Sequence, residues 1–476
     1  MSDPSSAVTP KGASSLIVSL VAAAFFMENL DGTIIATALP QMARSFHMHP
    51  VDLSIGITSY LLTLAVFIPV SGWVADRFGV RTVFTAALAV FTAASVACGM
   101  TNGLVEFTAA RVVQGLGGAM MVPVGRLAVL RVTSKDNLMR AISVITWPGL
   151  VAPIIGPPLG GLITTYSSWR WIFYLNLPLG LIGMVLAWCF ISPAGETEKR
   201  PFDGLGFVLC GVAGTAVMYA MELIGRAGAS WGEALAFLLI GLVAGASAWL
   251  HLGRTTHPVV DLSAFRIKTF AVATGGGSLF RISIGAVPFL VPLMFQLGFG
   301  MNAFRSGLLT LAIFAGNLSM KLVTTPTMKR FGFRSVLIVN GAMAAFSLAA
   351  ISLLSPSTPY VWILAVLFVS GLARSLQFTA INTLAFADVP KPQMSGASTL
   401  SSTLGQMTMG MGVAAGAIAL RASAWLHGHG AQSVTPTDFS LAFVLVAALS
   451  VIAIVDVFGL DPRAGAHVSG HQQREA

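Results

Sequence analysis

The feature that most constrains this chain is a succession of apolar segments separated by short polar or Gly/Pro-containing connections. A helix needs about 20 apolar residues to cross the hydrocarbon core of a bilayer. Only 9% of the 476 residues are charged, against roughly 25% in a soluble domain. We therefore predict an all-α integral membrane protein with about 14 transmembrane helices. The predicted spans are residues 16–38, 54–74, 81–99, 104–125, 141–164, 171–192, 205–222, 232–252, 269–298, 306–326, 335–354, 360–385, 395–420 and 438–459.

The basic residues are distributed unequally between alternate connections. If both termini are cytoplasmic, 18 of the 27 Lys and Arg residues lie on the inner side, five on the outer side and four within spans. Inner connections of membrane proteins carry this excess. The bias predicts a multi-pass protein of the cytoplasmic (inner) membrane with both termini inside. It also explains the net charge of +9 without a nucleic-acid partner.

The three cysteines, Cys98, Cys189 and Cys210, each lie inside an apolar run, without a CxxC pair or a nearby histidine at ligand spacing. We interpret them as small buried hydrophobic residues. We predict no metal site and no cofactor. The sequence also contains no P-loop or nucleophile elbow, so we expect neither an enzyme nor an ATP-driven pump.

A short internal repeat indicates how the spans are grouped. The sequence Arg-Phe-Gly-Val-Arg at 77–81 recurs as Arg-Phe-Gly-Phe-Arg at 330–334. Equivalent loops of two adjacent six-helix halves would lie about 200 residues apart, at roughly 33 residues per span and connection. The observed separation of 253 residues leaves room for two more helices. We predict a six-helix bundle at 1–192, two inserted linker helices at 193–265, and a second six-helix bundle with a cytoplasmic tail at 266–476.

Three motifs in the first half place charges or small residues where membrane helices meet. The loop 72–81 puts Asp76, Arg77 and Arg81 at the ends of neighbouring helices, and its glycines permit a tight turn. Arg111 lies within the fourth span, where a charge is costly unless it faces a partner or a wet cavity. The fifth span contains a Gly/Pro-rich run at 153–161 that permits close helix contact and kinks the helix.

Taken together, the segments 30–40, 72–81, 111–118, 153–161 and 169–180 resemble the major facilitator superfamily, and specifically its fourteen-span drug:proton antiporter branch. The resemblance covers nearly the whole chain. It implies a proton-coupled secondary exporter of drugs or other amphiphilic compounds that works by alternating access. The repeat at 330–334 is preceded by Lys329, where the loop motif has an acid, so an equivalent latch in the second half is not expected.

The resemblance also implies roles for individual residues. Arg111 would couple protonation to substrate binding; the alternative is a structural salt bridge. The inner gate would use Gly72, Asp76, Arg77, Gly79 and Arg81. There Asp76 would pair with Arg77, Arg81 or a neighbouring helix end as a latch that holds the gate shut in one state; the alternative is a solvated loop needed only for insertion. The hinge and seal of the fifth span would use Pro153, Gly156, Pro157, Gly160 and Gly161.

Two acids in the first span are candidates for the proton carrier. Glu28 and Asp31 are three residues apart on one predicted helix face, where burial and mutual repulsion favour binding of a proton. Asp31 belongs to the branch signature and Glu28 does not. The alternatives are that Asp31 is only a structural partner for a cation and that Glu28 lies near the surface.

The second half carries three cations within predicted spans, Arg281, Lys321 and Arg374. We expect them to line the substrate cavity together with Gln377 and Asn317. A basic cavity wall would favour an anionic or zwitterionic cargo. The alternative function is therefore export of a specific anionic metabolite or metal chelate, such as a citrate complex. A different interpretation is that these cations pair with acids or helix ends.

We expect the partners to be lipid, a small-molecule substrate and protons, with no nucleic acid, and the protein to act as a monomer. A third interpretation is a transporter-like sensor or accessory membrane protein without flux of its own. An importer is less favoured because the span-five motif resembles that of antiporters.

Overall fold

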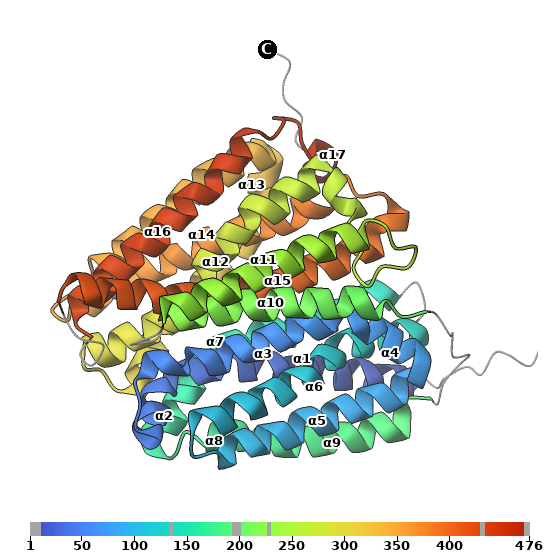
Figure 1. The fold of residues 1–476 in the computed structure, drawn as a ribbon, viewed down its shortest axis with the longest axis horizontal. Helices are drawn as coiled ribbons and strands as arrows, with labels where there is room; N and C mark the ends of the chain where they lie inside the picture. The colour runs from blue at the N-terminus through green and yellow to red at the C-terminus, as the bar shows by residue number, and fades with distance from the viewer. Residues whose placement is uncertain (1–10, 134–136, 193–200, 226–229, 429–433, 471–476) are drawn as a thin grey trace, which may run out of the picture.

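The computed structural model describes residues 11–133, 137–192, 201–225, 230–428 and 434–470. Within these ranges every regular element is helical (Figure 1). Thirteen of the helices there are long and apolar enough to cross a membrane. One of them, α13 (Ala303–Ser352), is two helices joined at Gly332, whose backbone is not helical. The described part of the chain therefore confirms the fourteen predicted spans and an all-α, multi-pass membrane protein.

The first half contains α1 (Lys11–Ile34), α2 (Leu39–Phe46), α3 (Ser54–Phe67), α4 (Ser71–Phe78), α5 (Val80–Met100), α6 (Leu104–Val132), α7 (Leu138–Tyr166), α8 (Trp171–Tyr174) and α9 (Asn176–Phe190). The remaining helices are α10 (Gly204–Gly225), α11 (Trp231–Leu252), α12 (Lys268–Leu293), α13, α14 (Tyr360–Ala387), α15 (Met394–Leu426), α16 (Pro436–Phe458) and α17 (Ala466–Ser469). Short turns join α1 to α2 at Ile35–Thr37 and α3 to α4 at Ile68–Val70.

The helices form two groups with a hairpin lying across them. Figure 1 shows α1 to α9 in one group, α12 to α16 in the other, and the green pair α10 and α11 along their boundary. The helix α10 packs against α3 of the first group and α15 of the second. The extra pair of helices therefore contacts both halves.

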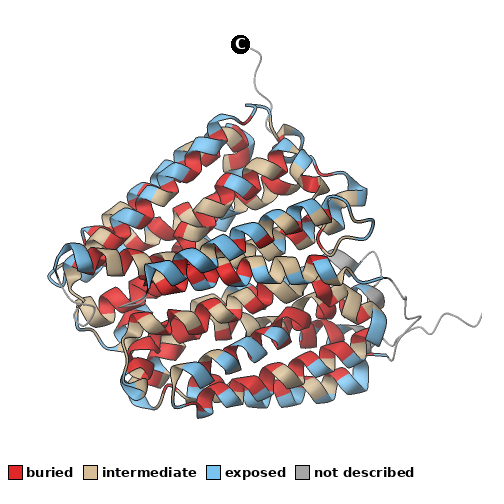
Figure 2. Cartoon of the chain, in the orientation of Figure 1, coloured by how far each residue is buried: buried red, intermediate tan, exposed pale blue. Residues whose placement is uncertain are grey.

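The outer faces of the helices, many of them exposed in Figure 2, carry large apolar side chains. On α9, Ile182 and Val185 are more than half exposed, and Val243 on α11 is 66% exposed. Such faces are stable only against lipid tails. Cys189 also lies on this surface, and Cys210 is half-buried. The prediction that all three cysteines are buried is therefore correct only for Cys98.

The repeated loop has the same backbone conformation in both halves. Gly79 has φ 83° and ψ 141°, and Gly332 has φ 71° and ψ 166°. Only glycine adopts this region readily. The arginine two residues later contacts the last helix of its own half in both copies. Arg81 stacks 4.2 Å above the Trp188 ring of α9, and Arg334 donates a hydrogen bond of 3.1 Å to the Phe458 carbonyl of α16.

The two halves meet at the end of the molecule opposite these turns. There, Gln296 Nε2 donates to the Thr37 carbonyl at 3.1 Å, and the Phe304 N–H donates to Thr165 Oγ1 at 3.1 Å. We call the end that carries the Gly79 and Gly332 turns the Gly79 end. Because contacts between the halves close the opposite end, the protein is described in a state closed at that end.

Candidate functional site

A cavity of about 810 Å³ lies between the two halves. Its walls come from α1, α4 and α6 of the first half and from α12, α14 and α15 of the second. Gly72 of α4 and Met394, the first residue of α15, also line it, so the cavity extends toward the Gly79 end. Its charged and amide-bearing residues are Glu28, Asn29, Arg126, Arg281, Asn382 and Gln406.

Glu28 is the acid that lines this cavity. Its Oε2 atom is buried and has no hydrogen-bond partner among the described residues. Arg126 of α6 and Arg281 of α12 line the same cavity, so Glu28 faces a space that holds two cations. A carboxyl group that borders an intramembrane cavity can exchange protons with water, and such groups mark transport pathways.

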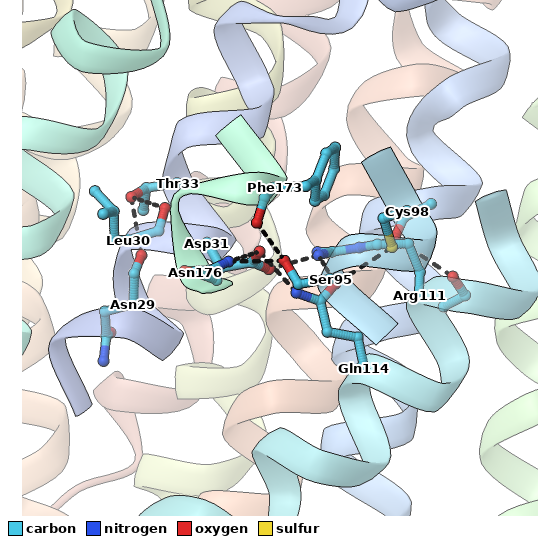
Figure 3. A network of polar contacts seen from close by, with 12 residues as sticks. Asn29, Leu30, Asp31, Thr33, Ser95, Cys98, Arg111, Gln114, Phe173 and Asn176 are labelled. Atoms are coloured by element: carbon cyan, nitrogen blue, oxygen red, sulfur yellow. Dashed lines mark hydrogen bonds and ion pairs between the residues drawn. The ribbon is translucent and has the colours of Figure 1, made fainter. Parts of the chain in front are cut away.

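Asp31 has a different environment, inside the first half (Figure 3). Its Oδ2 lies 2.5 Å from Arg111 Nη1. Its Oδ1 accepts hydrogen bonds from Gln114 Nε2 at 2.8 Å and from Asn176 Nδ2 at 3.1 Å. All four side chains are buried. Asp31 is therefore held by one cation and two amide donors within the first half.

The rest of the network ties five helices together. The Arg111 Nε–H donates to the Gly56 carbonyl of α3 at 3.1 Å, and the guanidinium stacks 4.1 Å from the Tyr60 ring. Asn176 of α9 also donates to Ser95 Oγ of α5 at 2.9 Å. A buried ion pair that loses one partner costs about 3–5 kcal/mol. The network therefore holds α1, α3, α5, α6 and α9 in one arrangement.

Glu28 and Asp31, the two proton-carrier candidates, lie in different environments. The sequence placed both acids on one face, but three residues along an α-helix leave side chains about 60° apart. Here that angle directs Glu28 to the cavity and Asp31 to Arg111. The alternative, that Asp31 is a partner for a cation, matches the geometry.

Of the five residues expected to line the cavity from the second half, Arg281 does so. It is 3% exposed, and its Nη2 donates to Asn382 Oδ1 at 2.7 Å. Lys321 is instead on an exposed face of α13, where its Nζ donates to Thr379 Oγ1 at 2.8 Å. Gln377 is buried within the second half and bonded to Asn340.

Arg374 and Asn317 also lie outside the cavity lining. Arg374 borders a separate gap of about 20 Å³ between the halves, beside Thr33 and Pro157. Asn317 contributes its backbone carbonyl to Ser375 Oγ at 2.8 Å. The proposed basic wall therefore reduces to Arg281 in the second half. Arg126, which faces it from the first half, was not predicted.

The loop at 72–81 borders a second space, a vestibule of about 1130 Å³ at the Gly79 end. Asp76 lines it, and within the described residues Asp76 has no ion pair with either arginine of the loop. Arg77 is exposed. The expected latch is therefore not formed in this state, which is the one open at this end.

Asp203 lines the same vestibule, just before α10. Burial by itself would raise the pKa of Asp203, but hydrogen bonds from His251 and from the backbone N–H groups of Gly206 and Val259 outweigh burial and lower it below the usual value. The acid therefore acts as an ionised anchor between the two ends of the α10–α11 hairpin.

The Gly/Pro-rich run lies in α7, where it contacts both halves. A Cβ atom at Gly156 would overlap Thr33 of α1, and one at Gly161 would overlap the backbone of Ala303 in α13. Only glycine permits these approaches. The motif therefore brings α7 against α13 at the closed end, as a seal would require.

Sequence reasoning missed two polar contacts that join separate parts of the molecule. Arg421 Nη2 of α15 lies 2.7 Å from Asp52 Oδ1, an ion pair between the two halves at the closed end. Ser54 Oγ donates to the buried Glu222 Oε1 of α10 at 2.9 Å. Both acids lie near predicted span boundaries, so their charge gave no signal of burial. No group of three or more metal-ligating side chains occurs among the described residues.

Comparisons with known proteins agree with this architecture. The sequence model of the Major Facilitator Superfamily matches residues 21–413. A protein of Pectobacterium atrosepticum named "Putative multidrug resistance protein MdtD" is 38% identical over 434 residues, covering 90% of this chain and 93% of the relative. A protein with the same name from Escherichia coli O157:H7 is 36% identical and covers 92% of this chain and 93% of its own length.

Solved structures share the fold at low sequence identity. The POT family transporter PepTSo has a TM-score of 0.69 at 12% identity, over 96% of this chain and 99% of that one. A D-xylose-proton symporter has a TM-score of 0.67 at 14% identity, over 95% and 99%. The family is one of transporters rather than enzymes. The chain belongs to the major facilitator superfamily.

Proposed function

We propose that this transporter exports amphiphilic organic compounds across the cytoplasmic membrane in exchange for protons. The observation that carries the proposal is Glu28, an intramembrane carboxyl group that borders the central cavity with one oxygen lacking a hydrogen-bond partner in the described structure. The relatives named as multidrug resistance proteins support export of such compounds. The positive-inside bias supports placing both termini and the Gly79 end in the cytoplasm.

In this proposal the described state is the one that faces inward. Cargo enters the cavity at the Gly79 end, and Glu28 releases its proton there. The ion pair between Asp52 and Arg421 and the contact of Gly161 with Ala303 open as the halves rock apart on the outside. A proton gradient supplies about 1.4 kcal/mol per pH unit, and a moving charge about 2.3 kcal/mol per 100 mV, so one or two protons suffice for steep accumulation outside.

Asp31 and Arg111 have a supporting part in this cycle. Their network fixes α1, which carries Glu28, against α3 and α6. A change of charge at Glu28 then acts on a rigid group of helices that move together, rather than on one flexible segment. We therefore assign coupling to Glu28 and positioning to Asp31 and Arg111.

The test is substrate-triggered proton movement in inverted membrane vesicles loaded with a pH-sensitive dye. The substrates are tetraphenylphosphonium, a lipophilic cation, and a metal–citrate chelate. Wild type should respond to the cation, Glu28→Gln should not, and Glu106→Gln, an exposed acid of α6, should match wild type. Full response of Glu28→Gln at equal membrane levels would reject the assignment.

One observation favours the alternative cargo. Among the described residues, two arginines, Arg126 and Arg281, line the cavity together with one acid, Glu28. A cavity with excess positive charge attracts anions. A response to the chelate alone, lost in Arg126→Gln and Arg281→Gln, would establish export of an anionic metabolite. No response to any substrate, with an unchanged cell phenotype in Asp31→Asn, would favour the sensor interpretation.

A further inference from the structure

A second, apolar cavity lies beside the central one, between the two halves and the inserted hairpin. Its volume is about 260 Å³. Its walls come from four helices, with Leu62 and Val66 on α3, Ala213 on α10, Ala248 on α11, and Met407 on α15. We call this space the hairpin chamber. None of the described residues that line it is charged.

The chamber exists because α3 and α15 separate toward the Gly79 end. The two helices meet at Gly410, where an added Cβ atom would lie 3.3 Å from Leu61 Cβ. One to three turns closer to the N-terminus of α15, the side chains of Met407, Leu404 and Leu400 line the chamber. The hairpin then covers the gap from outside. It forms the wall between the chamber and the lipid, and Met218 of α10 packs against the Gly410 contact.

The chamber and the central cavity lie on two sides of one helix. Leu400, Leu404 and Met407 of α15 face the chamber, whereas Ser402 and Gln406 line the central cavity. Pro69 of the turn after α3 borders both spaces. The chamber is therefore separated from the proposed transport path by little more than α15.

The floor of the chamber is the segment after α11, and polar contacts hold it in place. Val259 and Leu262 line the chamber. The Val259 N–H donates to Asp203 Oδ2 at 3.2 Å, and Asp203 Oδ1 lies 2.8 Å from His251 Nε2. These contacts fasten the segment to both helices of the hairpin. The chamber is therefore built by the inserted segment and would not exist in a twelve-helix arrangement of the two halves.

Size and polarity determine what the chamber can hold. A dry cavity of about 150 Å³ lined by aliphatic and aromatic side chains binds benzene, so 260 Å³ accommodates a larger group of one or two rings or a short alkyl chain. A charged group would be excluded, because the walls offer it no counter-charge. Pockets of this kind bind ligands chiefly through apolar contact.

We propose that the hairpin chamber binds the uncharged ring or short alkyl chain of a lipophilic molecule, and that α10 and α11 are inserted to form its outer wall. The source of this apolar group is either a lipophilic solute or the tail of a membrane lipid. The site is distinct from the central cavity, and binding to it does not require transport.

The test is photolabelling of the full-length protein in lipid nanodiscs. One probe is a diazirine-bearing alkylbenzene, and the other is a phospholipid with a diazirine on its acyl chain. Labelled residues are mapped by mass spectrometry. We expect modification of chamber residues such as Cys210 and Met407. Labelling by the alkylbenzene indicates a lipophilic solute as the bound molecule, and labelling by the phospholipid indicates a lipid tail.

Matched variants separate the chamber from the lipid-facing surface. Ala248→Leu fills the chamber, and Ala246→Leu makes the same change on an exposed face of α11. Ala248→Leu should reduce labelling of chamber residues about tenfold, whereas Ala246→Leu should leave it unchanged. Gly214→Leu fills the chamber from α10. It provides an independent test if Ala248→Leu does not fold.

Chamber labelling by either probe that Ala248→Leu or Gly214→Leu abolishes supports the site. Labelling that is absent in wild type, or equal in wild type and in both folded filling variants, would overturn it. Because this readout needs no proton gradient, such a failure would leave the proposed export untouched.

Discussion

Both halves contain the same type of glycine turn, but their buried arginines have different partners. Arg111 of the first half is fully buried and paired with the Asp31 carboxylate inside its own bundle. Arg281 of the second half is bonded to the neutral Asn382 and lines the central cavity. Arg111 therefore fixes helices of the first half, whereas Arg281 remains available to the cavity. A charge within a span is thus not by itself a mark of the substrate site.

The largest effect should separate these two arginines. Arg111→Met leaves the Asp31 carboxylate buried without its cation and should lower the free energy of unfolding by about 3–5 kcal/mol. Arg281→Met removes one charge-assisted hydrogen bond to a neutral amide and should cost less, about 1.5–3 kcal/mol. The measurement is denaturant unfolding of both variants in the same detergent. Equal losses of unfolding free energy in the two variants would contradict the comparison. The double variant Asp31→Leu with Arg111→Met should recover much of the stability lost in Arg111→Met.

The next effect tests what the halves have in common. Gly79→Ala and Gly332→Ala force a Cβ atom into a conformation reserved for glycine, at a cost of about 1–3 kcal/mol each. Thermal unfolding should therefore show similar destabilisation in the two variants. Gly72→Ala is the control, because no atom lies within 4 Å of its added Cβ. A loss confined to one variant would show that the two turns are not equivalent.

A smaller effect concerns the contact between the halves. Asp52→Asn removes the charge that Arg421 meets across the closed end. The pair is partly exposed, so its removal should destabilise the closed state by at most about 1 kcal/mol. This change allows about fivefold more opening. Opening of the closed end is measured as the rate at which an impermeant maleimide labels the thiol of a Thr37→Cys variant. His427→Gln alters the contact of His427 with Asp438 within the second half and should leave labelling unchanged. The opposite pattern would show that Asp52 is not part of the gate.

The smallest effect concerns the loop arginines. Trp188→Leu removes the ring below Arg81 and should cost about 0.5–1 kcal/mol, the value of an exposed cation–π contact. Leu179→Ala, another lipid-exposed position of α9, is the comparison that shows the effect of shortening an apolar side chain. Arg81→Met should make Trp188→Leu harmless in a double-mutant cycle. Additive losses in that cycle would show that the two side chains do not interact.

The sequence alone predicted the spans and the repeated glycine turn, because these depend on segment lengths and on glycine positions. The interpretation of α10 and α11 as an inserted pair stays a prediction. It could not predict the rotation of each helix. A span that is apolar on every side gives no periodic signal for its buried face, so Lys321 and Gln377 were placed in the cavity although they lie elsewhere. Glu28 and Asp31 were found together, but only packing against α6 and α9 distinguishes their environments.

The central claim is that Glu28 carries the proton and Asp31 does not. The most direct measurement is proton release by the purified protein when tetraphenylphosphonium binds, recorded with a pH dye in weakly buffered detergent solution. We predict release by wild type, none by Glu28→Gln at saturating ligand, and release by any Asp31→Asn protein that remains folded. Undiminished release by Glu28→Gln, together with loss in folded Asp31→Asn, would contradict the account and move the proton to the buried network.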